Sequence, residues 1–143
     1  MARIKLTITG KCLFTVSIPV RITDINYGNH LGNDALVSLL HEARVQWLHA
    51  LGYTELAFAG CSLIQGDLVV EYLNESFYGD KLTVNIHAAD ITRVSFDLLY
   101  EIQTVRNDQP IPVARAKTGL LCFDYASRKV ISMPEKIRAL LVD

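Results

Sequence analysis

One long amphipathic helix dominates the pattern of this sequence and restricts the folds that are open to it. Apolar residues recur at helical spacing through "NDALVSLLHEARVQWLHALG", which predicts a helix over residues 33–51. Asn33 or Asp34 can cap its start, and Gly52 can end it. A helix this apolar must be covered over most of its surface. The rest of the chain therefore has to supply the cover.

Strand-like segments make up most of the remaining sequence. Near-alternation of apolar and polar residues predicts a strand over 12–22, preceded by a short strand over 4–8. Pro19 indicates a sheet edge or the end of a strand. Turn signals at 78–80 and 106–110 separate the later strands. These strands are expected over residues 61–73, 80–92, 94–105 and 111–124.

Short connections join the last three strands, so they should form an antiparallel meander. Short helices are expected at 54–60 and at 133–142, the second with Pro134 in its first turn. A curved antiparallel sheet wrapped around the long helix is the economical way to cover it. The predicted class is α+β, with one domain over residues 1–143. Because such a sheet keeps a free edge or face, we expect a homo-oligomer, a dimer or a tetramer of dimers.

Composition and motifs exclude several function classes. The net charge of −1 argues against a non-specific binder of nucleic acid or of membranes. No sustained apolar run suggests a secretion signal or a membrane span, so a cytoplasmic location is expected. Three cysteines without a CxxC pair favour free thiols over a zinc site or disulfides. No GxxxxGK[ST] or GxGxxG motif occurs, and we expect neither a cofactor nor a metal.

A strongly polar loop, "DINYGNHLGND", lies directly before the long helix. A loop that ends at a helix N-terminus presents unpaired backbone N–H groups and the positive end of the helix dipole, which suits an oxyanion or a phosphate. Three amide side chains and one titratable base add to this, from Asn26, Asn29, Asn33 and His30. The alternative is structural, because such side chains also cap helices and satisfy the backbone of a loop.

The segment "VRITDINYGNHLGNDALVSLLHEARVQWL" resembles the opening of hotdog-fold thioesterases, the group that includes 4-hydroxybenzoyl-CoA thioesterase and the plant acyl-ACP thioesterases. The family pattern runs V-R-x-x-D-x-D-x-x-x-H-x-N-N and continues into a helix that carries E-A-R. "DLVVEYLNESFYGDKLTV" and "MPEKIRALL" resemble later blocks of the family, so the resemblance covers nearly the whole chain. It implies a long helix wrapped by an antiparallel sheet, paired into a dimer with the site between subunits. The matching positions are Val20, Arg21, Asp24, His30, Asn33, Glu42, Ala43 and Arg44.

The resemblance also implies a chemistry, the hydrolysis of an acyl-CoA or acyl-ACP thioester by water. In many members the second acid of D-x-D is the nucleophile or the base, and this chain has Asn26 there. An amide can do neither, but it can hold a water molecule or the thioester carbonyl. The Asn of the N-x-H pair in the plant enzymes falls on Gly28. His30 remains the best candidate base, because histidine titrates near neutrality, and Asp24 can orient it or the loop.

Two further residues are candidates through the resemblance. Glu42 is a substitute carboxylate, because related enzymes place a catalytic Glu on this helix. Arg93 falls where family members contact the phosphates of coenzyme A; otherwise it is a solvated turn charge. Two functions follow: a thioesterase whose N–H near Asn33 holds the oxyanion, or a non-hydrolytic acyl-thioester-binding protein. A dehydratase has less support, because no second His–Asp pair is present.

Overall fold

The computed structural model describes residues 1–142. No helix within this range is both long and apolar enough to cross a membrane. The predicted long helix is confirmed to within one residue at its end. In chain order the elements are β1 (Cys12–Pro19), the 3-10 turn η1 (Ile22–Asp24), α1 (Asn33–Ala50), β2 (Ser62–Tyr72), β3 (Lys81–Ala89), β4 (Ser95–Arg106), β5 (Gln109–Asp124), β6 (Lys129–Val130) and α2 (Glu135–Leu141).

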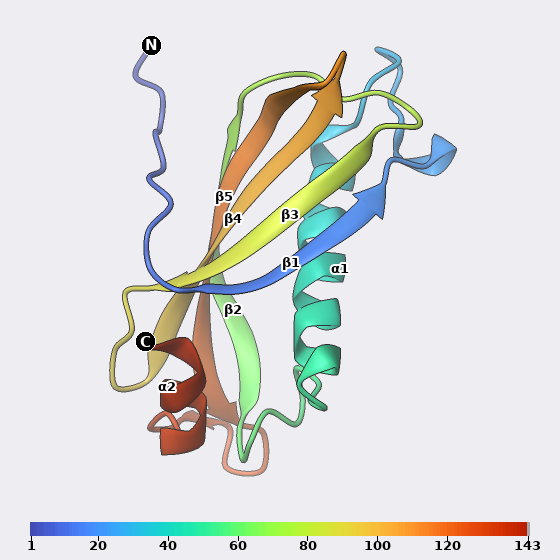
Figure 1. Ribbon diagram of the computed structural model, residues 1–143. Coiled ribbons are helices and arrows are strands. Elements are labelled where there is room, and N and C mark those ends of the chain that lie inside the picture. Colours follow the sequence, from blue (N-terminus) through green and yellow to red (C-terminus); the bar gives the residue numbers. More distant parts are fainter. Residues whose placement is uncertain (143) are drawn as a thin grey trace.

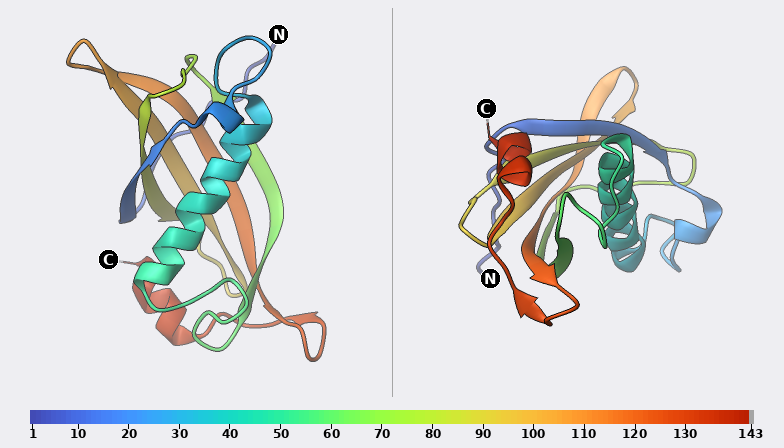
Figure 2. Two further views of the ribbon diagram at one scale, coloured as in Figure 1. Left: turned by 90° about the vertical axis from the view of Figure 1, so that its right-hand side faces the viewer. Right: turned by 90° about the horizontal axis from the view of Figure 1, so that it is seen from below.

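The five long strands form one antiparallel sheet in the order β1-β3-β4-β5-β2, and the short β6 pairs with the end of β5. β3, β4 and β5 pair in succession, which confirms the predicted meander. β1 and β2 are the two edges, and Pro19 ends the edge strand β1 as predicted. The sheet curves around α1, which lies across its concave face (Figure 1, Figure 2). The α+β prediction is therefore confirmed.

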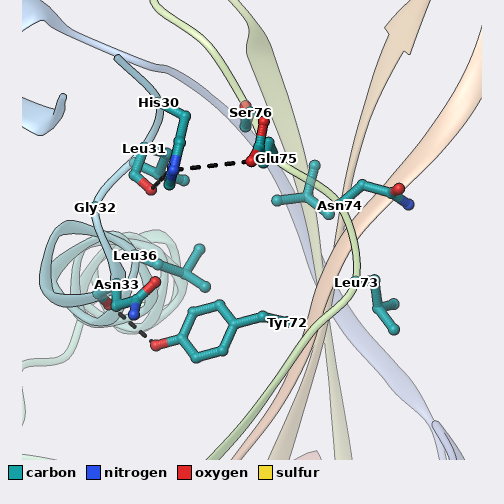
Figure 3. A pocket seen from close by; sticks show the side chains of 11 residues that line it. His30, Leu31, Gly32, Asn33, Leu36, Tyr72, Leu73, Asn74, Glu75 and Ser76 are labelled. Carbon is teal, nitrogen blue, oxygen red and sulfur yellow. Dashed lines mark hydrogen bonds and ion pairs between the residues drawn. The ribbon is translucent and has the colours of Figure 1, made fainter. Parts of the chain in front are cut away.

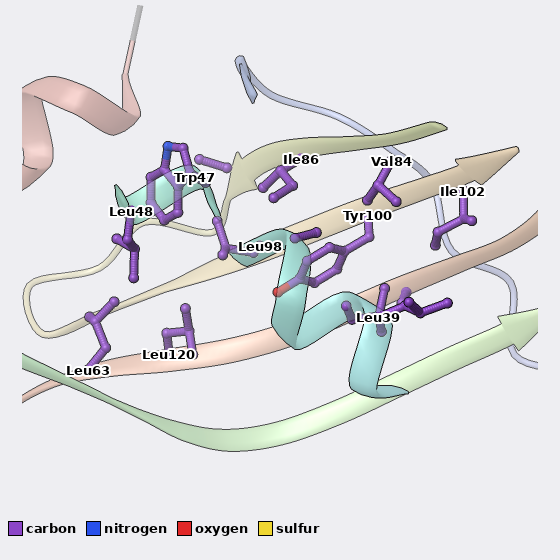
Figure 4. Packing of buried hydrophobic residues seen from close by; sticks show 14 of the residues in the cluster. Leu39, Trp47, Leu48, Leu63, Val84, Ile86, Leu98, Tyr100, Ile102 and Leu120 are labelled. Carbon is purple, nitrogen blue, oxygen red and sulfur yellow. The ribbon is translucent and has the colours of Figure 1, made fainter. Parts of the chain in front are cut away.

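α1 packs its apolar stripe against the concave face of the sheet. Every second residue of a strand lies on that face, because side chains alternate across a sheet. Ile86 of β3 and Leu98 of β4 belong to the same buried cluster as Trp47 and Leu48 of the helix (Figure 4). Burying one such side chain stabilises the fold by about 1.5–3 kcal/mol. The helix residues that are at most 3% exposed are Leu36, Leu39, Leu40, Ala43, Trp47 and Leu48.

The predicted strand over 4–8 is wrong. The first nine residues have no strand pairing and cross the outer face of the sheet (Figure 1). A side-chain contact helps to hold them there, because the Leu6 N–H donates to Glu71 Oε1 at 3.0 Å. Gly10 makes this path possible: its φ is +83°, and a Cβ atom there would lie 1.8 Å from the Ala88 carbonyl oxygen.

The predicted helix over 54–60 is also wrong, and this segment forms tight turns. The Ala57 N–H donates to Thr54 Oγ1 at 3.1 Å, which closes a local turn. Ala59 and Gly60 then have φ values of +48° and +102°, outside the helical region. The segment thus turns sharply from the end of α1 into β2.

The start of α1 differs from the prediction in one respect. Its N-cap is Gly32, whereas Asn33 and Asp34 already have their places within the helix. β1 is likewise shorter than predicted, because the chain leaves the sheet after Pro19 and forms the turn η1. At the other end of the chain, α2 confirms the expected C-terminal helix, with Pro134 at its N-cap.

Candidate active site

A cavity of about 210 Å³ opens at the start of α1 (Figure 3). Residues 30–33 and Leu36 line one side of it, and residues 72–76 at the end of β2 line the other. Val113 of β5 adds an apolar wall. The polar loop ahead of the helix therefore meets a segment that is about forty positions away in the sequence.

The helix start itself leaves backbone donors open. No side-chain hydrogen bond caps α1 at Gly32 within the described residues. The Gly32 carbonyl accepts the first intrahelical bond, from the Leu36 N–H at 3.0 Å. The N–H groups before Leu36 have no acceptor one turn earlier in the helix. Because Asn33 lines the cavity, this end of it is suited to an oxygen that develops negative charge.

His30 lies at the edge of the cavity with its side chain 28% exposed. Its Nδ1 atom is 3.2 Å from the Leu31 carbonyl oxygen. A carbonyl can only accept, so Nδ1 carries the proton in this contact and Nε2 is the free acceptor. Nε2 lies 3.9 Å from Glu75 Oε1, within ion-pair distance but too far for a direct hydrogen bond. The ring is thus arranged to accept a proton from a water molecule.

Tyr72 and Glu75 are site residues that the sequence reasoning did not select. The Tyr72 hydroxyl donates to the Asn33 carbonyl at 3.2 Å and joins the end of β2 to the helix start (Figure 3). Burial raises the pKa of Tyr72, and the charge of Asp34 raises it further, so the phenol remains a neutral donor. The available signal was the polar run "EYLNES", where the apolar pattern of β2 stops.

Asn26 shapes the loop and does not line the cavity. Its Oδ1 accepts the Gly28 N–H at 2.9 Å, and its own N–H donates to the His30 carbonyl at 3.0 Å. A Cβ atom at Gly28 would lie 3.0 Å from His30 Nε2 and 3.3 Å from Asn26 Oδ1. The tight loop therefore brings the imidazole and the amide to the same glycine.

Asp24 is buried, and its contacts hold the two ends of the loop together. Its carboxylate accepts the Arg21 N–H at 2.8 Å and the Arg21 guanidinium at 3.3 Å. Its carbonyl oxygen accepts the Gly32 N–H at 2.9 Å. Within residues 1–142 no hydrogen bond joins Asp24 to His30. The observed contacts of Asp24 therefore orient the loop backbone.

Glu42 and Arg93 do not reach this cavity within one copy of the chain. Glu42 is exposed on α1, accepts a hydrogen bond from Gln46 Nε2 at 2.7 Å, and lines a separate groove beside β1. Arg93 lies in the connection between β3 and β4 and donates to Ser132 Oγ at 2.8 Å. That connection is at the far end of β4, roughly 25 Å along the strand from the cavity.

The buried thiols offer no alternative nucleophile. All three cysteines are free, as predicted; Cys12 is exposed, whereas Cys61 and Cys122 are buried. Burial raises the pKa of Cys61, and burial together with the neighbouring Cys61 raises the pKa of Cys122 to about 12. Both buried thiols are therefore protonated at neutral pH. No group of His, Cys, Asp and Glu side chains in residues 1–142 is placed to hold a metal ion.

Comparison with known proteins supplies the family. The family model of the thioesterase-like superfamily matches residues 20–141. A 1,4-dihydroxy-2-naphthoyl-CoA hydrolase of Nostoc punctiforme is 26% identical over 127 residues, which cover 87% of this chain and 83% of that protein. Both observations concern nearly the whole chain, including the polar loop and the segment of Tyr72 and Glu75.

Solved structures agree with this assignment at the level of the fold. A 1,4-dihydroxy-2-naphthoyl-CoA thioesterase from Synechocystis superposes with a TM-score of 0.78 at 22% identity, covering 90% of this chain and 94% of that chain. An Asp-to-Asn mutant of 4-hydroxybenzoyl-CoA thioesterase, complexed with 4-hydroxybenzoyl-CoA, gives 0.79 at 15% identity, covering 90% and 97%. The predicted hotdog fold is confirmed, and the chain belongs to the thioesterase-like superfamily, a family of thioester hydrolases.

Proposed function

We propose that this chain is an acyl-CoA thioesterase that hydrolyses an aromatic acyl-CoA. The observation that carries the proposal is the open start of α1 at Gly32, which shares a cavity with His30. Membership of the thioesterase-like superfamily supplies the bond that is cleaved. The aromatic acyl group and coenzyme A are taken from the substrates in the names of the relatives, 1,4-dihydroxy-2-naphthoyl-CoA and 4-hydroxybenzoyl-CoA.

In the proposed mechanism, the thioester carbonyl oxygen accepts the N–H of Asn33 at the helix start. A water molecule adds to the carbonyl carbon while His30 Nε2 takes one of its protons, and Glu75 stabilises the imidazolium ion. The negative charge on the oxygen of the tetrahedral intermediate is held by the backbone N–H. The intermediate then expels the coenzyme A sulfur, which receives the proton from His30. The products are a carboxylic acid and the free thiol.

We further propose that the complete site lies between two copies that pair through β2. The free edge of this strand carries partly exposed apolar side chains, with Leu68 37% and Tyr72 41% exposed. A two-fold axis would make the two β2 edges antiparallel and extend the sheet. The same pairing would bring Arg93 of the second copy toward the end of the sheet that holds the cavity. This placement fits the expected contact between Arg93 and the phosphates of coenzyme A.

One observation favours the alternative, a protein that binds an acyl thioester without hydrolysing it. By the resemblance to hotdog-fold thioesterases, Asn26 stands where many members have a catalytic carboxylate, and its amide oxygen already accepts the Gly28 N–H. In this alternative the loop holds the thioester, and His30 serves only as a hydrogen-bonding group. Asn26→Asp would then create a carboxylate at that position and raise hydrolysis from near zero.

The test is an assay of the purified protein with aromatic, short-chain and medium-chain acyl-CoAs, in which a thiol reagent detects free coenzyme A. General-base catalysis typically contributes about 10²–10⁴ in rate. We therefore expect His30→Ala to lower kcat by about 10² or more, and Glu42→Gln to leave it nearly unchanged. A fully active His30→Ala variant beside an inactive Glu42→Gln variant would place the base on the helix. A parent protein that binds these esters but hydrolyses none would support the alternative.

A further inference from the structure

A second polar cluster lies on the β2 side of α1, outside the cavity. His41 Nε2 is 2.6 Å from Glu55 Oε1, and Arg44 Nη2 is 3.6 Å from Glu55 Oε2. Arg44 is buried, and its Nη1 atom donates to Gln65 Oε1 and to the Tyr100 hydroxyl, both at 3.3 Å. A buried guanidinium ion is costly without a partner. Glu55 is thus the ion-pair partner of the buried Arg44.

The atoms of this cluster that a ligand can reach are those of Glu55 and His41. Their side chains are 26% and 59% exposed, whereas Arg44 is 7% exposed and already bonded on its Nη atoms. The Arg44 Nε atom has no hydrogen-bond partner in the described part of the chain, but it is fully buried. An ionised carboxylate has about four acceptor positions, so Glu55 keeps spare capacity. The cluster therefore presents mainly an acceptor for a hydrogen-bond donor.

An apolar groove adjoins this acceptor. It has a volume of about 320 Å³, and Glu55 forms part of its wall. A charged side chain in a largely apolar groove is the arrangement that fixes the orientation of a largely apolar ligand. The other lining residues are Val45, Leu48, His49, Tyr53, Thr54 and Leu56.

The groove and the cavity lie at opposite ends of β2. The Leu63 N–H donates to the Glu55 carbonyl at 2.7 Å, which places the cluster at the beginning of the strand. Tyr72, which lines the cavity, is the last residue of the strand. When two β2 edges pair antiparallel, the end of one strand meets the beginning of the other. Each cavity would then face the groove and the Glu55 cluster of the second copy.

We infer that Glu55 and His41 of one copy recognise a hydroxyl group at the far end of the acyl chain whose thioester lies in the cavity of the other copy. This inference rests on the proposed function and names its substrate class, a hydroxyaryl-CoA. The hydroxyl donates to the Glu55 carboxylate, and the ring lies in the apolar groove. An anionic acyl substituent is disfavoured, because the accessible group of the cluster is itself an anion.

The first experiment compares 4-hydroxybenzoyl-CoA with benzoyl-CoA by their kcat/KM values. A hydrogen bond to a charged group is worth about 10- to 100-fold, so the parent should prefer the hydroxylated ester by at least about tenfold. Glu55→Gln should remove most of this preference. Because Glu55→Gln also weakens the pairing of buried Arg44, His41→Gln is tested beside it and should reduce the preference while Arg44 stays paired. Glu135→Gln, the same chemical change at an exposed position of α2, should leave the preference unchanged.

The second experiment tests whether the cluster acts across two copies. Mixed dimers of a His30→Ala chain and a Glu55→Gln chain would contain one site with both defects and one site with neither. They should therefore keep hydrolysis with the parental preference for the hydroxyl group. If the cluster serves the cavity of its own chain, every site of a mixed dimer carries one defect. The hydrolysis that remains would then come from sites without Glu55 and would lack the parental preference for the hydroxyl group.

The outcomes separate this inference from the proposed function. Normal hydrolysis with an unchanged preference in Glu55→Gln and His41→Gln would overturn the inference and leave the thioesterase proposal standing. A preference for 4-carboxybenzoyl-CoA over the hydroxylated ester would overturn it as well. If the parent hydrolyses no ester, the proposed function fails, and calorimetry with the same two esters then tests whether the hydroxyl group is recognised. Equal affinities of the parent for both esters would overturn the inference.

Discussion

At its start, α1 meets a cavity, and no side chain of residues 1–142 caps it at Gly32. At its end, three backbone hydrogen bonds close onto the last turn: Leu51 and Tyr53 donate to the Leu48 carbonyl at 3.0 and 2.9 Å, and Gly52 donates to the His49 carbonyl at 2.9 Å. Gly52 has a φ of +83°, the left-handed conformation that ends many helices. One end of the helix is open to a ligand and the other is closed on itself.

The side chains that surround the two ends of α1 also differ. Near the closed end, the rings of Trp47 and Phe58 meet edge to face at 5.7 Å, and Tyr53 lies 5.2 Å from Phe58. Near the open end, polar side chains and backbone groups share the lining of the cavity with apolar residues such as Leu31 and Leu36. The closed end is held by packed aromatic rings, whereas the open end leaves space for a ligand beside its N–H groups. Each of the following predictions tests this difference between the open start and the closed end of α1.

The largest effect is expected at the closed end. Trp47→Ala removes a fully buried ring and leaves a cavity, which typically costs about 3–5 kcal/mol of unfolding free energy. Trp47 is fourteen positions after Asn33, roughly 21 Å along the helix, so kcat of the molecules that remain folded should be nearly unchanged. Chemical denaturation and an acyl-CoA assay measure the two quantities. A loss below about 1 kcal/mol, or a fall in kcat as large as that of His30→Ala, would contradict this difference.

The open end depends on support from outside the helix. The Leu31 N–H donates to the Ser76 carbonyl at 2.7 Å, and Ser76 Oγ donates to Asp80 Oδ2 at 2.9 Å. The same carboxylate oxygen accepts the Phe77 N–H at 2.9 Å and Arg106 Nη2 at 2.6 Å. The turn before β3 is therefore tied to the loop that carries His30.

An intermediate effect is expected for Asp80→Asn. Burial by itself raises the pKa of Asp80, but hydrogen bonds from Arg106, the Phe77 N–H and Ser76 outweigh it and lower that pKa. A lowered pKa in the folded state means that ionised Asp80 stabilises the fold above its unfolded pKa and that this stabilisation is lost as the pH falls through the folded pKa. We expect Asp80→Asn to lower the unfolding free energy by about 2 kcal/mol at pH 7.

Denaturant titrations of the parent and Asp80→Asn at several pH values check this expectation. The difference between the two proteins should be constant above about pH 5 and should shrink below about pH 4, where the carboxyl takes up a proton. Asp124→Asn is a matched control, because the pKa of Asp124 is also lowered, by hydrogen bonds from Ser127 and the Ala126 N–H, but at the end of β5 beside an exposed turn. A difference that persists unchanged at pH 3 would show that the charge of Asp80 is not the cause.

The sequence predicts α1, the meander and the C-terminal helix correctly, because apolar spacing and turn residues are local signals. It misplaces residues 54–60, whose apolar and small residues also fit a helix, since nothing in the pattern shows that Ala59 takes a left-handed conformation. The strand expected over 4–8 fails for a similar reason. Its alternation is real, but the chain crosses the outer face of the sheet and finds no partner strand.

The site is predictable on one side only. The composition of the polar loop predicts a site there, and His30 and Asn33 do line the cavity. Tyr72 and Glu75 complete it through the curvature of the sheet, which no local pattern encodes. The contact between the Asp24 carboxylate and the Arg21 N–H is equally hidden, because it depends on the direction in which the loop turns. The catalytic and coenzyme A-binding roles of the candidate residues remain predictions.

The smallest effect separates the two glycines that flank α1. At Gly52 a Cβ atom would meet nothing within 4 Å, but the φ of +83° is strained for alanine by about 1–2 kcal/mol. At Gly32, which lines the cavity, the backbone suits alanine, with φ −69° and ψ 150°, and a Cβ atom would lie 2.8 Å from Oδ1 of the exposed Asp34 side chain. We therefore expect Gly52→Ala to lower the unfolding free energy by about 1 kcal/mol without changing kcat/KM. Gly32→Ala should do the reverse, with near-parental stability and a lower kcat/KM.

Gly52→Asn is the control for conformation, because asparagine tolerates the left-handed region better than alanine and should recover part of the loss. Thermal unfolding and steady-state kinetics on the same preparations decide the matter. If Gly32→Ala and Gly52→Ala lose stability equally and both keep full activity, the start of α1 is a closed structural end like its other terminus, and the cavity there has no part in the reaction.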